Sequence, residues 1–378
     1  MPLPKIVYYI SGHGYGHAVR SIQIINELLG LGCNVIIKTI TPAFLFKEGL
    51  SRPVEIMPES FDVGLDQIDN VRFDLQKTKE SVKKLLASAE ELIWKEQKFL
   101  STRGISGIVC DIPFIPLAAA ERMGLPSVGI SNFSWDWIYS FYGQRDPEWY
   151  PLAETIRSYY REGGFLLRLP FYGEMEAFQK IEDIPLVSRR SRKGKALVRK
   201  ILDLPTDRKI GLIGFSRLDL QDRAIQKIGE FSPDYLFLIK HPLNWRSPVF
   251  KRVEQEGISF VDLVCTADFV ITKPGYGILA DCLSHGTPMI YSDRGEFPEY
   301  PILVEGIKHH LSYCYMPKED LYSGNWGPYL EGINKQVQLK PGLRTDGARA
   351  AARKILKWIG VNARSVNSLH RSAKQEDS

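Results

Sequence analysis

Short apolar runs that are continuous, rather than alternating with polar residues, are the strongest constraint on the fold of this chain. The strands of a parallel sheet have such continuous apolar sequences when helices cover both faces of the sheet. Four such runs stand in the first half of the sequence: KIVYYISG (5–12), NVIIKTI (34–40), GIVCDI (107–112) and PSVGISN (126–132). Helical patterns separate them, such as the spacing of Ala18, Ile22, Ile25 and Leu29 and the long amphipathic segment 78–100. We therefore predict a βαβ array with a parallel sheet.

The same pattern begins again in the second half. Further apolar runs predict strands at KIGLIG (209–214), YLFLIK (235–240), ISFVD (258–262), FVIT (269–272) and PMIYSD (288–293). We expect an α/β protein with two doubly wound sheets in tandem, a first domain over 1–183 and a second over 184–342. The basic segment 186–207 is predicted to hold the linker and the first helix of the second domain. A closing helix is expected within 343–360, followed by a loose tail over 361–378.

Composition narrows the class of protein. The 378 residues are 44% hydrophobic, and the formal net charge of +5 is too small to indicate a nucleic-acid partner. No apolar stretch reaches 18 residues and no signal-peptide pattern opens the sequence, so we expect no transmembrane segment and a cytoplasmic location. Five widely spaced cysteines without a CxxC pair are expected to be reduced thiols rather than metal ligands.

The first predicted strand leads into a turn rich in glycine and histidine, GHGYGH. Its pattern is Gly12-x-Gly14-x-Gly16-His17, with a second histidine at His13. In an open parallel sheet ligands bind outside the carboxyl ends of the strands, and glycines let a ligand approach a helix N-terminus. The spacing is not the GxGxxG fingerprint, and no acidic residue ends the second strand, which disfavours a nicotinamide cofactor. The alternative is a tight turn whose histidines only cap a helix.

Several stretches resemble known glycosyltransferase-like proteins. Residues 7–35, VYYISGHGYGHAVRSIQIINELLGLGCNV, resemble the N-terminal, glycosyltransferase-like domain of L-arabinokinase-type proteins, and more distantly the GGTGGH loop of MurG-type GT-B glycosyltransferases. Further matching stretches follow in order at 109–139, 165–178, 184–190 and 271–303; the NFSWD and KPGYG segments are the specific ones. The resemblance implies a GT-B fold, in which two Rossmann-like domains face a cleft and a C-terminal helix crosses back to the first domain.

The resemblance also implies a donor site on the second domain. A nucleotide-diphosphate sugar is expected to lie against the turn and helix of FVITKPGYGILADCL, where Asp281 occupies the place of a ribose-binding carboxylate. A first-turn acid interacting only with the helix dipole is the alternative for Asp281, and a surface ion pair is the alternative for Arg294. The expected donor-binding residues are Ser216, Arg217, Lys273, Gly275, Tyr276, Gly277, Asp281, Arg294, Glu296 and Glu299.

Sugar transfer needs a base that takes the proton of the acceptor hydroxyl. His17 aligns with the histidine of the GGTGGH loop and is the first candidate; His13 is the second. A helix N-terminus disfavours the imidazolium form and so favours a neutral base. Trp135 is expected either to face a sugar ring or to belong to the core. The expected acceptor-binding residues are Gly12, Gly14, Gly16, Asp111, Asn132, Trp135 and Asp136.

These observations predict a glycosyltransferase of the hexosyl or N-acetylhexosaminyl type. We expect a UDP-sugar as co-substrate, no other cofactor, and a carbohydrate or lipid-linked acceptor that allows peripheral contact with a membrane. The sequence has no DxD motif for a phosphate-bridging metal, which predicts metal-independent transfer. Two alternatives remain open: a UDP-sugar 2-epimerase-like enzyme, which would consume donor without an acceptor, and a non-catalytic protein that binds sugar nucleotides.

Overall fold

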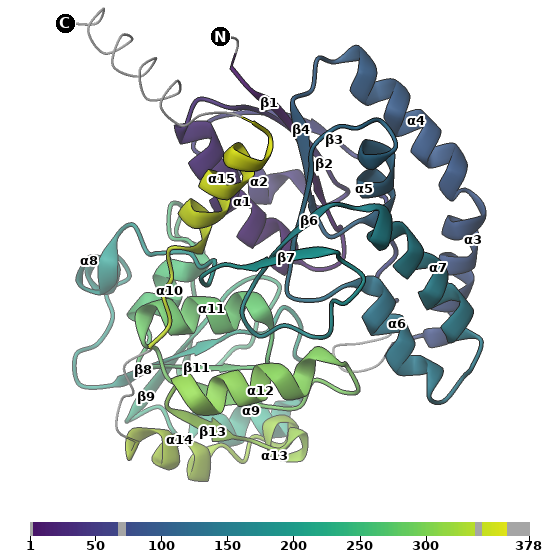
Figure 1. Ribbon diagram of the computed structural model, residues 1–378. Coiled ribbons are helices and arrows are strands. Elements are labelled where there is room, and N and C mark those ends of the chain that lie inside the picture. The colour runs from purple at the N-terminus through teal and green to yellow at the C-terminus, as the bar shows by residue number, and fades with distance from the viewer. Residues whose placement is uncertain (1–2, 67–72, 337–341, 361–378) are drawn as a thin grey trace, which may run out of the picture. The chain divides into compact units, whose positions relative to one another are not determined.

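The chain divides into two compact units in a computed structural model that describes residues 3–66, 73–336 and 342–360. Of these, the first unit holds residues up to 187 together with those from 344 onward, and the second holds 188–343 (Figure 1). Both units have a parallel sheet with helices, as the apolar runs predict. The predicted tail at 361–378 lies outside the described residues.

The sheet of the first unit has seven parallel strands in the order β3-β2-β1-β4-β5-β6-β7. The winding direction reverses between β1 and β4, where Ile10 pairs with Asp111 at the carboxyl ends of the two strands. In open parallel sheets such a switch point forms the ligand-binding crevice. The strands are β1 Lys5–Ile10, β2 Asn34–Lys38, β3 Glu55–Met57, β4 Gly107–Asp111, β5 Ser127–Ser131, β6 Phe165–Arg168 and β7 Lys180–Asp183.

Eight described helices belong to the first unit. They are α1 Tyr15–Gly30, α2 Ala43–Gly49, α3 Leu75–Ala87, α4 Ala89–Thr102, α5 Phe114–Glu121, α6 Trp135–Gly143, α7 Trp149–Glu162 and α15 Gly347–Trp358. The single long helix predicted over 78–100 is instead two helices, α3 and α4, that meet at Ser88. The Ser88 hydroxyl donates to the carbonyl of Leu85 at 3.0 Å, a local bond by which serine competes with the helical pattern.

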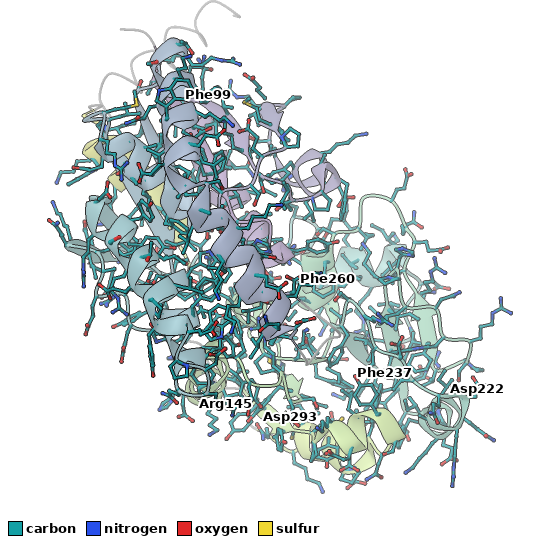
Figure 2. All side chains as sticks on the ribbon, turned by 90° about the vertical axis from the view of Figure 1, so that its right-hand side faces the viewer. Phe99, Arg145, Asp222, Phe237, Phe260 and Asp293 are labelled. Carbon is teal, nitrogen blue, oxygen red and sulfur yellow. The ribbon has the colours of Figure 1, made fainter. Side chains whose placement is uncertain are left out.

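The second unit has six parallel strands in the order β10-β9-β8-β11-β12-β13. The Phe237 side chain of β9, labelled in Figure 2, is buried in the core of this unit. The Trp326 ring meets it edge-on at 5.3 Å. The strands are β8 Lys209–Ile213, β9 Tyr235–Ile239, β10 Phe250–Arg252, β11 Phe269–Thr272, β12 Met289–Tyr291 and β13 Tyr313–Tyr315. The helices are α8 Gly194–Ile201, α9 Asp222–Gly229, α10 Phe260–Thr266, α11 Tyr276–His285, α12 Glu299–His310, α13 Lys318–Ser323 and α14 Gly327–Asn334.

One predicted strand is wrong. The run ISFVD at 258–262 contains the beginning of helix α10, which starts at Phe260. Ser259 and Asp262 form a capping box: the Ser259 side chain accepts from the Asp262 backbone, and the Asp262 carboxylate accepts from the Ser259 amide at 3.0 Å. These reciprocal bonds satisfy backbone amides that the start of a helix leaves without partners. They favour a helix here over the strand that the apolar run predicts.

Helix α15 packs on α1 within the first unit, and Figure 1 shows the two side by side. Ile355 and Leu356 are buried, and the Trp358 ring lies 4.6 Å from that of Phe165 on β6. The chain therefore leaves the first unit after Val187 and returns to it at Arg344, where Leu186 donates to the Arg344 carbonyl at 3.0 Å.

All five cysteines are free, and Cys33, Cys110 and Cys282 are buried. Among the described residues, no helix is both long and apolar enough to cross a membrane.

Replacing Ile355 by alanine is expected to lower the free energy of unfolding of the first unit by about 2 to 5 kcal/mol, because it leaves a cavity beneath α15. Denaturant unfolding followed by tryptophan fluorescence measures the change. The matched control is Lys357→Ala on the exposed face of the same helix, expected to stay within about 0.5 kcal/mol. Equal stability of both variants would contradict the packing of this helix on the first unit.

Candidate active site

The glycine-rich turn between β1 and α1 lies at the switch point of the first unit. Gly14 is the N-cap of α1 with φ of 85°, a backbone conformation that favours glycine, and no side chain caps the helix. Gly12 lies directly against Ile40, while the Cα of Gly16 faces open space. The turn therefore presents backbone and free helix amides where a ligand would lie.

His17 and Asp111 form a buried pair at this edge of the sheet. His17 is in the first turn of α1, Asp111 is the last residue of β4, and His17 Nδ1 lies 2.8 Å from Asp111 Oδ1. Burial by itself would raise the pKa of Asp111, but the charge and hydrogen bonds of Arg20, together with His17, outweigh it and lower the pKa to about 2. Asp111 is therefore a carboxylate at neutral pH.

Arg20 holds Asp111 in place. Its Nε donates to Asp111 Oδ2 at 2.7 Å, and its Nη1 donates to the amide oxygen of Asn132 at 2.7 Å. Ser21 adds a hydroxyl hydrogen bond to Asp111 Oδ2 at 2.9 Å. Sequence reasoning missed Arg20 and Ser21. The signal was present, because His17, Arg20 and Ser21 are polar residues at i, i+3 and i+4 and so share one face of α1.

The ionised carboxylate decides which nitrogen of His17 carries the proton. A carboxylate only accepts hydrogen bonds, and Nη2 of Arg20, which lies 3.1 Å from the same ring nitrogen, already donates its two hydrogens to Asp111 and Ser131. Nδ1 of His17 is therefore the donor to Asp111 Oδ1 at 2.8 Å. Nε2 is then left with its lone pair as an acceptor. This is the arrangement of a histidine base oriented by a buried acid.

Trp135 and Asp136 do not lie on an exposed surface that could contact a sugar. Trp135 is buried, with its ring stacked on Tyr139 at 5.8 Å, so it belongs to the core. Asp136 is also buried and accepts from Arg157 Nε at 3.0 Å. His13, by contrast, is partly exposed and lies 6.0 Å from the Trp135 ring.

In the second unit, Asp281 is one turn into α11 but turned inward. It is 1% exposed, and Arg189 binds it with two guanidinium nitrogens, Nε donating to Oδ1 at 3.2 Å. Both carboxylate oxygens are thereby engaged, which is neither of the two environments expected for Asp281.

The other predicted donor residues lie on the loops that follow β8, β11 and β12 and in the first turns of α11 and α12. Gly275 is the N-cap of α11 and no side chain caps this helix, which begins with Tyr276 and Gly277. Arg294 joins two of these loops: Nη1 donates to the Pro274 carbonyl at 3.2 Å, and the guanidinium lies 3.5 Å from the Glu299 carboxylate. Arg294 thus has an ion pair, as its alternative reading expects, but the partner carboxylate of Glu299 is buried rather than at the surface. Lys273 is half-buried beside them, whereas Ser216, Arg217 and Glu296 are exposed.

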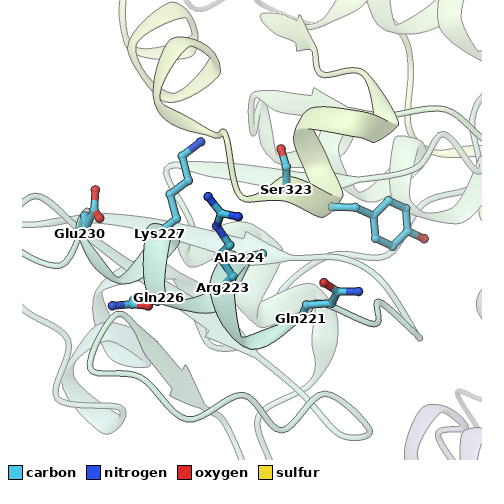
Figure 3. A pocket seen from close by; sticks show the side chains of 8 residues that line it. Gln221, Arg223, Ala224, Gln226, Lys227, Glu230 and Ser323 are labelled. Carbon is cyan, nitrogen blue, oxygen red and sulfur yellow. The ribbon is translucent and has the colours of Figure 1, made fainter.

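A separate hollow of about 630 Å³ lies between α9 and α13 of the second unit (Figure 3). Its polar lining includes Arg223, Lys227 and Ser323 but none of the predicted site residues. Within the described part of the chain, no group of three or more His, Cys, Asp or Glu residues is arranged to hold a metal ion.

Comparison with known proteins gives one similar sequence among curated proteins and many similar folds. No family model matches the chain. Over 348 residues, 88% of this chain, the sequence is 30% identical to L-arabinokinase of Arabidopsis thaliana. The chain spans about a third, 32%, of the length of that protein.

Several glycosyltransferase structures match along almost the whole chain. The glycotransferase of kitacinnamycin aligns with a TM-score of 0.64 at 16% identity, over 98% of this chain and 99% of that chain. Arabidopsis thaliana UGT89C1 solved with quercetin aligns with a TM-score of 0.60 at 15% identity, over 97% and 98%. The same protein solved with UDP-L-rhamnose gives 0.59 at 12% identity, over 98% of both chains.

These likenesses agree with the two parallel-sheet units. The chain therefore has the GT-B fold of these glycosyltransferases, and its sequence is similar to part of L-arabinokinase.

Proposed function

We propose that this protein transfers a sugar from a nucleotide-diphosphate sugar, preferably a UDP-sugar, to an acceptor hydroxyl. The observation that carries the proposal is the buried His17–Asp111 contact of 2.8 Å at the switch point of a GT-B fold. UGT89C1, a structural neighbour, was solved with UDP-L-rhamnose and with quercetin. That likeness supports the class of reaction, and the residues of this chain support the mechanism.

His17 acts as the general base in this proposal. Nε2 takes the proton of the acceptor hydroxyl while the hydroxyl oxygen forms a bond to the anomeric carbon of the donor sugar. The bond from that carbon to the diphosphate breaks, and its electron pair leaves with the diphosphate. Asp111 stabilises the imidazolium that forms and keeps Nδ1 protonated throughout. Arg20 keeps Asp111 ionised and oriented, and it offsets the cost of burying that charge.

The donor diphosphate is assigned to the N-terminus of α11 in the second unit. The positive end of the α11 helix dipole favours a diphosphate there. Arg294 and Lys273, beside this helix start, add positive charge that stabilises a departing diphosphate without a metal ion. Asp281 is left out of this assignment because Arg189 engages its carboxylate.

His17→Ala is expected to lower turnover by about 10² to 10⁴-fold while leaving the affinity for the donor unchanged. Release of UDP from UDP-glucose in the presence of an acceptor panel gives turnover, and a thermal-shift titration with UDP gives affinity. The control is His309→Ala, an exposed histidine of α12. A transferase loses activity only in the first variant. Consumption of the donor without any acceptor would favour the epimerase-like reaction, and binding without turnover would favour the non-catalytic reading.

Asp111 is expected to make folding sensitive to acid. Its pKa of about 2 in the folded chain lies below the ordinary value near 3.9, so its ionisation stabilises the fold above about pH 4. This contribution, about 2 to 3 kcal/mol, is lost as the pH falls from about 4 through about 2. Urea unfolding across this range should show the loss in the wild type and not in Asp111→Asn. The exposed control Asp207→Asn should behave as the wild type.

UDP is expected to stabilise the protein, by about 2.7 kcal/mol at 100 times its dissociation constant. Arg294→Met should weaken UDP binding by about 1.5 to 3 kcal/mol if the guanidinium contacts the diphosphate through charged hydrogen bonds. The matched control is Arg353→Met, an exposed arginine of α15. Undiminished stabilisation by UDP in Arg294→Met would remove this residue from the donor site.

A further inference from the structure

Helix α8 of the second unit exposes two apolar side chains. The helix packs on α10, and Val198 is its buried residue. Leu197 and Ile201 lie one turn apart on the helix, yet they remain 48% and 39% exposed. Figure 1 shows α8 at the outer side of this unit, next to α10. The helix therefore presents an apolar pair to its surroundings.

The segment that contains α8 is strongly basic. Residues 184–202 include seven Lys and Arg residues and no Asp or Glu, and the acids that flank this stretch in sequence are Asp183 and Asp203. The basic excess of this one segment is thus larger than the net charge of the whole chain, +5. The seven cations are Arg189, Arg190, Arg192, Lys193, Lys195, Arg199 and Lys200.

Three of these cations bind acids of their own unit. Arg189 binds Asp281. Lys195 Nζ lies 2.9 Å from one carboxylate oxygen of Asp268, and Arg199 Nη1 lies 3.9 Å from the other. These ion pairs hold α8 and the turn before it on the second unit.

Other cations of the segment lie beside the apolar pair. Lys193 precedes Leu197 by four residues and Lys200 follows it by three, so the three side chains share one face of the helix. Arg192 and Lys200 are exposed, and Lys193 is half-buried. Among the described residues, no carboxylate forms an ion pair with Arg192, Lys193 or Lys200. The outward face of α8 thus combines apolar side chains with positive charge.

This combination indicates the chemistry of a partner. Basic residues alone suit any polyanion, but half-exposed Leu and Ile side chains gain free energy only where a partner places apolar groups beneath its negative surface. An anionic phospholipid bilayer has this layering, because charged headgroups lie above hydrocarbon. Amphipathic helices with clustered Lys and Arg bind such surfaces for this reason.

We propose that α8 docks on an anionic membrane surface. Leu197 and Ile201 enter the boundary between headgroups and acyl chains, and the cations beside them contact lipid phosphates. A short helix with two apolar side chains gives weak and reversible binding. The inference does not depend on the proposed transfer reaction, although a position on a membrane suits a lipid-linked acceptor.

Co-sedimentation of the full chain with vesicles tests the docking in the absence of donor and acceptor. Binding is expected to an equal mixture of phosphatidylserine and phosphatidylcholine, and not to phosphatidylcholine alone. Raising the salt from about 0.1 M to about 1 M shortens the Debye length from about 10 Å to about 3 Å and should release the protein. Equal binding to both kinds of vesicle, or to neither, would overturn the proposal.

Charge reversal distinguishes α8 from the net charge of the chain. Lys193→Glu combined with Lys200→Glu should weaken vesicle binding about twentyfold or more, because each basic residue near the surface contributes about fivefold. The control combines Arg223→Glu with Lys227→Glu on α9, which changes the net charge equally at exposed positions of the same unit. It should bind like the wild type. An equal loss in both double variants would contradict docking through α8; thermal unfolding shows that each variant is folded.

A second pair of variants tests the apolar contact. Leu197→Gln combined with Ile201→Gln should weaken vesicle binding about tenfold. The control, Phe44→Gln with Tyr322→Gln, alters side chains that are also 48% and 39% exposed and should bind like the wild type.

Insertion into the bilayer has its own readout. Leu197→Trp should add tryptophan fluorescence that brominated phosphatidylcholine in the mixed vesicles quenches. Poly-L-glutamate serves as a soluble acidic chain for comparison. If the protein binds poly-L-glutamate as tightly as the vesicles, and the two glutamine substitutions on α8 leave vesicle binding unchanged, the partner is an acidic protein segment and membrane docking is refuted.

Discussion

The burial of the Asp111 charge is the constraint on which the first unit depends. A carboxylate at the end of a central strand, with no exposure to water, is costly unless cations and donors surround it. Arg20 and Ser21 come from α1 and Asn132 from the loop after β5, so the compensation ties the first helix to two neighbouring strands. The same network fixes the tautomer of His17. Stability and the proposed chemistry therefore share one set of hydrogen bonds.

A second buried charge lies in the same unit. Lys38, the last residue of β2, is 2% exposed and lies 2.6 Å from Glu96 of α4, which also accepts from the Tyr9 hydroxyl at 2.6 Å. Burial raises the pKa of Glu96, although Lys38 and Tyr9 oppose that rise. The pair joins β1, β2 and α4, and the Lys38 ammonium lies 5.4 Å from the Phe61 ring, next to Asp62. Charge burial thus supports the segment that holds His13.

The second unit uses its buried acid for a different purpose. Arg189 and Ser191 belong to the basic segment that begins this unit, and they bind Asp281 and Asp262 on α11 and α10. The Ser191 amide also donates to Nε2 of His285 at 3.1 Å. These contacts attach the segment to its own unit. The sequence therefore predicts Asp281 as a ligand-binding residue, whereas in the fold its carboxylate binds Arg189.

The sequence by itself determined the two-sheet architecture and the place of the glycine-rich turn, because both depend on local signals. Strands that are buried on both sheet faces must be continuously apolar, and the turn after the first strand needs glycine for its backbone conformation. It also predicted His17 and Asp111 as site residues, although it could not pair them. The run at 258–262 misled because apolar residues do not distinguish a buried strand from a helix, and the capping box decided the outcome. Tertiary structure alone brought Asp62 to His13, 49 residues away, and Arg189 to Asp281, 92 residues away. Which acid meets which base depends on where separate loops lie at the sheet edge, and no local pattern encodes that meeting.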